Sequence, residues 1–104
     1  RLINLDNQVI NIEISKILIS DPDKNRDFDK NLFTEDFNEI LNDENIDLVI
    51  EVLGGIDPGK EYIKSLLQKG KAVITANKDI IAESGRELVE LAQKNNTCLY
   101  FVII

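Results

Sequence analysis

Short apolar runs alternate with amphipathic helical patterns along this chain, and the alternation limits the possible folds more than any other feature. The apolar runs predict strands at residues 12–19, 46–53, 72–75 and 99–104. A pattern with one apolar helical face follows each of the first three runs. Strands that alternate with helices are joined by crossover connections, which make neighbouring strands parallel. The sequence therefore predicts an α/β fold with a doubly wound parallel sheet.

Local signals set the expected boundaries of the helices. Residues 1–8 carry the apolar spacing of the last turns of an amphipathic helix. Thr34 is the expected N-cap of a short helix, and Asp57, which precedes a proline, is the expected N-cap of the next one. Residues 84–87, Ser-Gly-Arg-Glu, are typical of a capping box, so a further helix is expected to begin there.

Composition and charge exclude several classes of function. The net charge of −7 argues against nucleic-acid binding, because phosphate contacts need clustered Lys and Arg. The longest uncharged apolar run is far shorter than the roughly 20 residues that cross a membrane, and no segment has the pattern of a signal peptide. The single cysteine, Cys98, lies in an apolar run, which favours a small core residue and a reducing compartment such as the cytoplasm.

Metal binding has little support in the sequence. The chain has no histidine, and its one cysteine has no partner for a metal site. Residues 35–47 hold six Asp and Glu residues and no Lys or Arg. Such a stretch could bind a metal or a basic partner, but the pattern favours the solvated outer face of a helix.

Two loops where strands give way to helices hold the candidate binding residues. Gly54 and Gly55 follow the strand at 46–53, and glycines let a backbone approach a ligand closely. Asn77, in the loop after the next strand, can donate and accept hydrogen bonds as recognition of a carboxamide requires, and Lys78 offers a charge for a phosphate or carboxylate. In open parallel sheets, ligands bind at these carboxyl ends of the strands. By themselves, however, the glycines fit a tight turn equally well, and the lone lysine fits a solvated surface better.

In order and spacing, these motifs resemble the cofactor-binding domain of homoserine dehydrogenase. The matching runs are Glu-Val-Leu-Gly-Gly-Ile-Asp-Pro at 51–58, Lys-Gly-Lys-Ala-Val-Ile-Thr-Ala-Asn-Lys at 69–78 and Ala-Glu-Ser-Gly at 82–85. The resemblance covers nearly the whole chain, and Thr-Ala-Asn-Lys is its most specific part. It implies a Rossmann-like doubly wound sheet and an NAD(P)-dependent interconversion of L-aspartate 4-semialdehyde and L-homoserine, in threonine and methionine biosynthesis.

The resemblance also implies roles for single residues. Gly54 and Gly55 are expected to lie along the NAD or NADP cofactor. Ala76, Asn77 and Lys78 are expected to approach its nicotinamide half. In this context a binding role for Lys78 is favoured over a solvated surface lysine.

The sequence departs from the family at both ends. The opening strand with its Gly-rich phosphate loop and the catalytic domain are absent, so residues 1–104 are expected to be part of a dinucleotide-binding domain, incomplete and inactive alone. A small-molecule substrate and a homo-oligomer through the absent catalytic domain follow from the resemblance, and no catalytic residue is assigned. Two alternatives stay open. One is a non-enzymatic acidic signalling module, which would need an aspartate where the strand at 46–53 ends in glycines. The other is a related NAD(P)-dependent amino-acid or semialdehyde dehydrogenase.

Ser20 and Asp21 end the first expected strand, where a dinucleotide-binding sheet meets the adenine ribose. Family members often carry an arginine where Ser20 stands, and arginine accommodates the 2′-phosphate of NADP. Lys24 and Arg26 in the following turn could take that role, and a turn shaped with Pro22 is a purely structural alternative. The sequence thus favours use of NAD at least as well as NADP.

Overall fold

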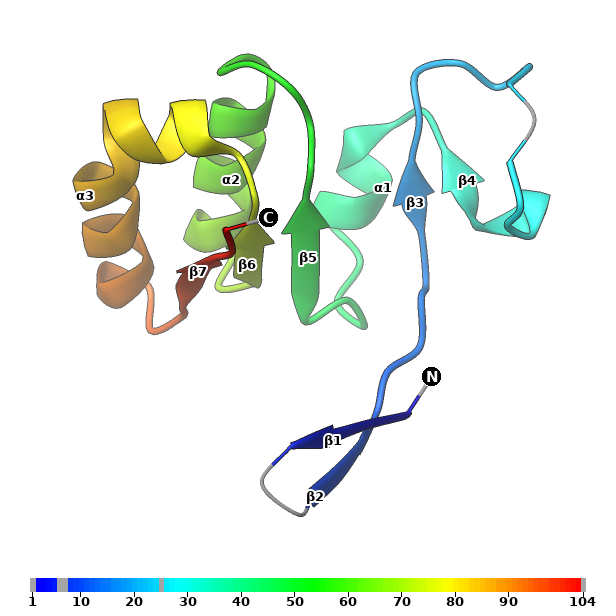
Figure 1. Ribbon diagram of the computed structural model, residues 1–104, viewed down its shortest axis with the longest axis horizontal. Helices are drawn as coiled ribbons and strands as arrows, with labels where there is room; N and C mark the ends of the chain where they lie inside the picture. Colours follow the sequence, from blue (N-terminus) through cyan, green and yellow to red (C-terminus); the bar gives the residue numbers. More distant parts are fainter. Residues whose placement is uncertain (1, 6–7, 25, 104) are drawn as a thin grey trace. The chain divides into compact units, whose positions relative to one another are not determined.

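The computed structural model describes residues 2–5, 8–24 and 26–103, with the side chains described from residue 11 onward (Figure 1). The chain divides into two compact units, residues 1–40 and residues 41–104.

The first unit begins with a two-stranded antiparallel sheet. Strand β1 (Leu2–Leu5) pairs with β2 (Gln8–Asn11), and Leu2 lies opposite Asn11. The helix expected at residues 1–8 is therefore wrong for residues 2–5, while residues 1, 6 and 7 lie outside the described part of the chain. Ile3, Val9 and Ile10 are β-branched, which favours strands, and so short a segment has too few turns to nucleate a helix.

A second pair of strands in this unit is short and parallel. Strand β3 (Ile17–Leu18) pairs with β4 (Phe33–Thr34), which follows a 3₁₀ turn, η1 (Lys30–Leu32). The strand expected at 12–19 is thus confirmed only at its end. Helix α1 (Phe37–Leu41) follows, and Asp36 just before it caps its start, because Asp36 Oδ1 accepts a 2.9 Å hydrogen bond from the Asn38 N–H. The expected N-cap Thr34 lies two residues too early, in the strand.

The second unit is a three-stranded parallel sheet packed against two helices. Its strands β5 (Leu48–Glu51), β6 (Ala72–Thr75) and β7 (Leu99–Phe101) are neighbours in that order. Helix α2 (Gly59–Gln68) connects the first two strands, and α3 (Lys78–Lys94) connects the last two (Figure 1). The parallel α/β architecture expected from the alternation is confirmed, and the strand at 72–75 has the expected bounds.

The core of this unit lies between the helices and one face of the sheet. It consists of apolar side chains that are almost fully buried: Ile63, Leu66, Leu67, Val73, Ile80, Leu88 and Ala92. On the other face of the sheet, side chains of β5 and of the residues just after it are exposed to solvent. Ile50 is 64% exposed and Val52 is 70% exposed. The strand expected at 46–53 is confirmed over residues 48–51, and one of its faces is open to solvent. Cys98 is likewise exposed, just before β7, and is not a core residue.

Two helix starts differ from the local signals. Helix α2 begins after Pro58, which occupies the N-cap position, and Asp57 makes no capping hydrogen bond. Helix α3 is continuous from Lys78, so no helix begins at the capping-box pattern at 84–87. Ser84 is a buried residue within α3. Helix α2 ends just before Gly70, which adopts a φ of +81°, a conformation that glycine reaches without steric cost.

The first turn of α2 packs so closely on the end of β5 that a side chain at Gly59 would collide with it. A Cβ atom there would lie 3.0 Å from Glu51 Oε2 and 3.0 Å from Ile80 Cδ1. At Gly85, in the middle of α3, an added Cβ would meet only Ile81 Cγ2, at 3.4 Å.

We predict that Gly59→Ala and Gly85→Ala change stability in opposite directions. Overpacking at Gly59 should lower the free energy of unfolding by about 1–3 kcal/mol. The same substitution at Gly85 should raise it by up to about 1 kcal/mol, because alanine favours the helix. Chemical denaturation of the two variants measures the difference. Equal stability of Gly59→Ala and the unmodified protein would show that Glu51 is not held in place.

Candidate functional site

The candidate site lies where β5 and β6 end and α2 and α3 begin (Figure 1). Residues 52–58 connect β5 to α2, and Ala76 and Asn77 connect β6 to α3. Because both strands are parallel, the two loops emerge at the same edge of the sheet. That edge is where open α/β sheets bind their ligands.

A buried carboxylate joins the two strand ends. Glu51, the last residue of β5, is only 5% exposed. Its Oε1 accepts a hydrogen bond from the Thr75 hydroxyl at the end of β6. Its Oε2 accepts one from the Leu53 N–H at 2.9 Å and one from Asn77 Nδ2 at 3.4 Å. The carboxylate therefore links its own strand, the following loop and the start of α3.

Asn77 joins the glycine loop, residues 53–55, to the start of α3. Its Nδ2 donates to the carbonyl oxygens of Leu53, at 2.9 Å, and Gly55, at 2.6 Å. Its Oδ1 accepts from the Ile80 N–H at 3.2 Å and so caps the helix. Both amide hydrogens and the amide oxygen of Asn77 thus have partners within the chain. The expected contact of Asn77 with a carboxamide stays a prediction, and it would require one of these bonds to break or to be shared.

The loop presents backbone donors on its outer side. In a planar trans peptide, the C=O and N–H groups point in opposite directions. Since the carbonyls of Leu53 and Gly55 face Asn77, the N–H groups of Gly54 and Ile56 face away from it. Neither N–H forms a hydrogen bond within the described residues. Two donors are therefore available to a ligand at this edge.

Gly54 is not required by the packing of the chain itself. A Cβ atom at Gly54 would meet nothing within 4 Å, and its φ is not in the positive range. Gly55 differs, because its φ of +73° favours glycine whatever lies nearby. The close approach of a ligand needs such open space, and the expected contacts of Gly54 and Gly55 with a cofactor stay predictions.

The other expected site residues are partly brought together. Ala76 is half-buried beside Asn77, and Lys78 is exposed as the first residue of α3. Ser20 is exposed after β3 and belongs to the first unit. Sequence reasoning missed Glu51 and Thr75 as members of the site. A carboxylate that ends an apolar strand was the available signal for Glu51.

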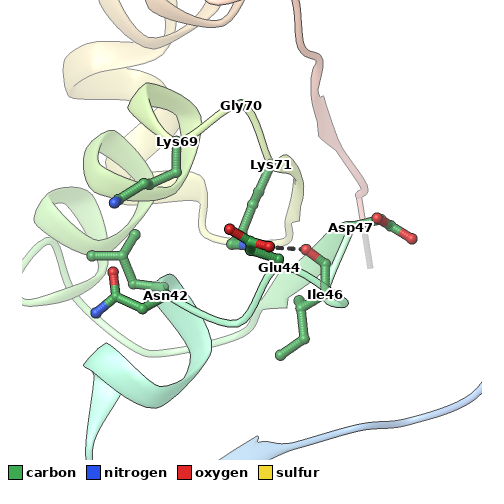
Figure 2. A pocket seen from close by; sticks show the side chains of 8 residues that line it. Asn42, Glu44, Ile46, Asp47, Lys69, Gly70 and Lys71 are labelled. Carbon is green, nitrogen blue, oxygen red and sulfur yellow. Dashed lines mark hydrogen bonds between the residues drawn. The ribbon is translucent and has the colours of Figure 1, made fainter.

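A pocket of about 410 Å³ lies at the other end of the sheet, before β5 and β6 begin (Figure 2). The buried Lys71 extends beside it and donates to the carbonyl oxygens of Asp43 and Ile46, at 2.7 and 2.8 Å. Acidic side chains from Glu44 and Asp47 share its wall. The pocket is remote from the strand ends that carry the candidate site, and Lys71 there serves to fasten the loop before β5.

Within the part of the chain that the structure describes, there is no group of three or more His, Cys, Asp or Glu residues arranged to hold a metal ion. Over the same residues, every helix is too short or too polar to cross a membrane.

Comparison with known proteins gives one consistent result. Residues 1–102 match the family described as homoserine dehydrogenase, NAD binding domain. The homoserine dehydrogenase of Bacillus subtilis is 38% identical over 92 residues, which are 86% of this chain and 21% of that protein. The enzyme of Lactococcus lactis is 39% identical over 101 residues, 93% of this chain and 23% of that protein.

Solved structures agree with the sequence matches. A crystal structure of S. aureus homoserine dehydrogenase at pH 8.5 superposes with a TM-score of 0.80 and 42% identity, over 88% of this chain and 23% of that one. The enzyme from Thiobacillus denitrificans gives a TM-score of 0.64 at 33% identity, over 66% of this chain and 16% of that one.

The chain thus spans about a fifth of the length of the curated relatives it matches. Its fold is Rossmann-like, as the parallel sheet and the structural neighbours show. NAD or NADP is the cofactor consistent with this assignment. The chain belongs to the family of homoserine dehydrogenase NAD-binding domains.

Proposed function

We propose that residues 1–104 are part of the dinucleotide-binding domain of an NAD(P)-dependent oxidoreductase that interconverts L-aspartate 4-semialdehyde and L-homoserine. The observation that supports this most is the loop after β5, where Gly54 stands in open space beside two outward-facing N–H groups. The similarity to homoserine dehydrogenases over residues 1–102 supplies the choice of substrate. The reaction would serve threonine and methionine biosynthesis, in the cytoplasm.

The catalytic groups are proposed to lie outside these residues. The matched regions of the relatives amount to 21% and 23% of their lengths, so most of each relative has no counterpart in this sequence. The domain that handles the substrate, and the homo-oligomer formed through it, belong to that remainder. The test is an assay of the intact gene product for homoserine-dependent reduction of NAD and NADP. Dinucleotide binding without homoserine oxidation would favour a related amino-acid or semialdehyde dehydrogenase.

Lys78 is the residue proposed to meet an anionic group of the cofactor or substrate. It is the first residue of α3 and is solvent-exposed. A cation at this end of a helix is unfavourable, because the helix dipole places partial positive charge there. The helix dipole therefore gives no stabilising reason for a lysine at this position, which supports a role in binding.

We predict that Lys78→Ala separates activity from stability. The catalytic efficiency of the intact enzyme should fall roughly 10–100-fold, the effect of losing one charged hydrogen bond. The melting temperature should stay the same or rise slightly, because an unfavourable charge is removed from the helix start.

Lys94→Ala is the matched control for this variant. Lys94 is exposed in the last turn of the same helix, where a cation is favourable. Its removal should lower stability by less than about 1 kcal/mol and leave the kinetics unchanged. Unaltered kinetics and a lowered melting temperature in Lys78→Ala would show that the lysine is structural.

The loop after β3 supports use of NAD at least as well as NADP. Ser20 is exposed, and no arginine stands in its place. Arg26 Nη1 donates to the carbonyl oxygens of Asp21, at 2.6 Å, and Lys24, at 3.1 Å. The guanidinium carbon of Arg26 lies over the Phe33 ring, 5.4 Å from the ring centroid. These contacts hold Arg26 within the turn, so a 2′-phosphate would have to compete with them. Asp21 also shapes the turn, because its Oδ1 accepts from the Asp23 N–H at 3.0 Å.

We predict that kcat/KM with NAD equals or exceeds kcat/KM with NADP, measured at fixed homoserine and salt concentrations. Ser20→Arg should shift the ratio toward NADP, because its guanidinium can pair with the 2′-phosphate. A tenfold or greater preference of the unmodified enzyme for NADP would contradict the prediction. In that case Arg26→Ala should reduce the NADP rate selectively, which would identify Arg26 as the phosphate ligand.

A further inference from the structure

Glu51 is a charged group in an unusual place. It is 5% exposed, and no Lys or Arg forms an ion pair with it among the described residues. Its carboxylate is stabilised by three donors instead: the Thr75 hydroxyl, the Leu53 N–H and the Asn77 amide. Burying a charge is costly unless hydrogen bonds compensate. An apolar residue would fill this end of the sheet without that cost, so the carboxylate calls for a reason beyond packing.

Thr75 connects Glu51 to the backbone of the second loop. Its hydroxyl donates to Glu51 and accepts a 3.0 Å hydrogen bond from the Asn77 N–H. Thr75 is 0% exposed, so it cannot touch a ligand itself. Any effect of Thr75 on a ligand must therefore pass through its neighbours.

Three bonds of this cluster hold the loop after β5. Glu51 accepts from the Leu53 N–H, and Asn77 donates to the carbonyls of Leu53 and Gly55. Because these two carbonyls face inward, the N–H groups of Gly54 and Ile56, which share their peptide planes, are fixed outward. The cluster thus determines the direction of the donors that the loop presents.

We propose that Glu51, Thr75 and Asn77 are positioning residues that hold the Leu53–Gly55 loop with the N–H groups of Gly54 and Ile56 directed at an oxygen acceptor of the dinucleotide. The inference rests on the proposed function, because it takes the ligand of this loop to be NAD or NADP. It assigns Asn77 an indirect action through the loop, in place of direct recognition of the carboxamide. None of the three residues takes part in the chemical step.

Thr75→Val is the variant that tests the proposal. It keeps the branched shape of a fully buried side chain and replaces only the hydroxyl, with a methyl group. In the intact gene product, it should raise the Kd and KM for the preferred cofactor about tenfold, while kcat at saturating cofactor changes little. In the cofactor-free protein, the Leu53 amide should exchange with solvent faster, because Glu51 loses the bond that fixes its carboxylate. Thr75→Ser retains the hydroxyl, so its cofactor Kd and KM and its Leu53 exchange rate should match those of the unmodified protein.

Lys71→Met is the matched control at the opposite end of the same strand. Lys71 is also buried and also ties the region before β5 to β6 through hydrogen bonds, here to the carbonyls of Asp43 and Ile46. Its replacement should alter the melting temperature and leave the cofactor Kd and the Leu53 exchange rate unchanged. If Thr75 were purely structural, Thr75→Val would behave like Lys71→Met: its melting temperature would change, and its cofactor Kd and Leu53 exchange rate would not.

A second variant keeps the proposal testable if Thr75→Val does not fold. Asn77→Ser retains an oxygen that can cap α3 but cannot reach the carbonyls of Leu53 and Gly55. It should weaken cofactor binding and, in the cofactor-free protein, speed exchange at Leu53. Weaker binding without faster exchange would overturn the proposal in favour of a direct contact. Failure of the unmodified protein to bind either dinucleotide would refute the proposed function, whereas normal binding by both variants would refute this inference alone.

Discussion

Glu51 brings a negative charge into the end of the sheet, where little water can solvate it. Hydrogen bonds from Thr75, Leu53 and Asn77 take the place of water. These donors come from the next strand, the following loop and the cap of α3, so the carboxylate can be stabilised only when all three are in position. The geometry of the candidate site therefore depends on this one buried group.

The same two strands are fastened at their other ends by a buried cation. Lys71 precedes β6 and donates to carbonyl oxygens in the loop before β5, as Figure 2 shows for Ile46. Each end of the β5–β6 pair thus has one buried charge held by hydrogen bonds to the neighbouring segment. The two ends differ in their backbone donors: the N–H groups of Gly54 and Ile56 face outward at the carboxyl end, whereas those of Gly70 and Lys71 at the other end donate within the chain. That difference separates a structural fastening from a candidate binding site.

Much of the fold follows from local signals in the sequence, and so do the two loops of the candidate site, but the hydrogen bonds that join these loops do not. The apolar run at 72–75 predicts β6 with its observed bounds, because this signal is contained within a few residues. Thr75 and Asn77, which donate hydrogen bonds to Glu51, lie 24 and 26 residues further along the chain, so no local pattern reveals them. The Ser-x-x-Glu pattern at Ser84 fails for a related reason. Asn77 caps the helix about two turns before Ser84, and the helix continues through Ser84.

A crystal structure of the intact gene product with its preferred cofactor tests the central claim most directly. The account predicts a dinucleotide at the carboxyl ends of β5 and β6, with an acceptor oxygen within hydrogen-bond distance of the Gly54 or Ile56 N–H. The amide of Asn77 should still donate to the carbonyls of Leu53 and Gly55 in that complex. A cofactor bound away from this loop, or an Asn77 amide turned from the loop to the nicotinamide carboxamide, would contradict the account.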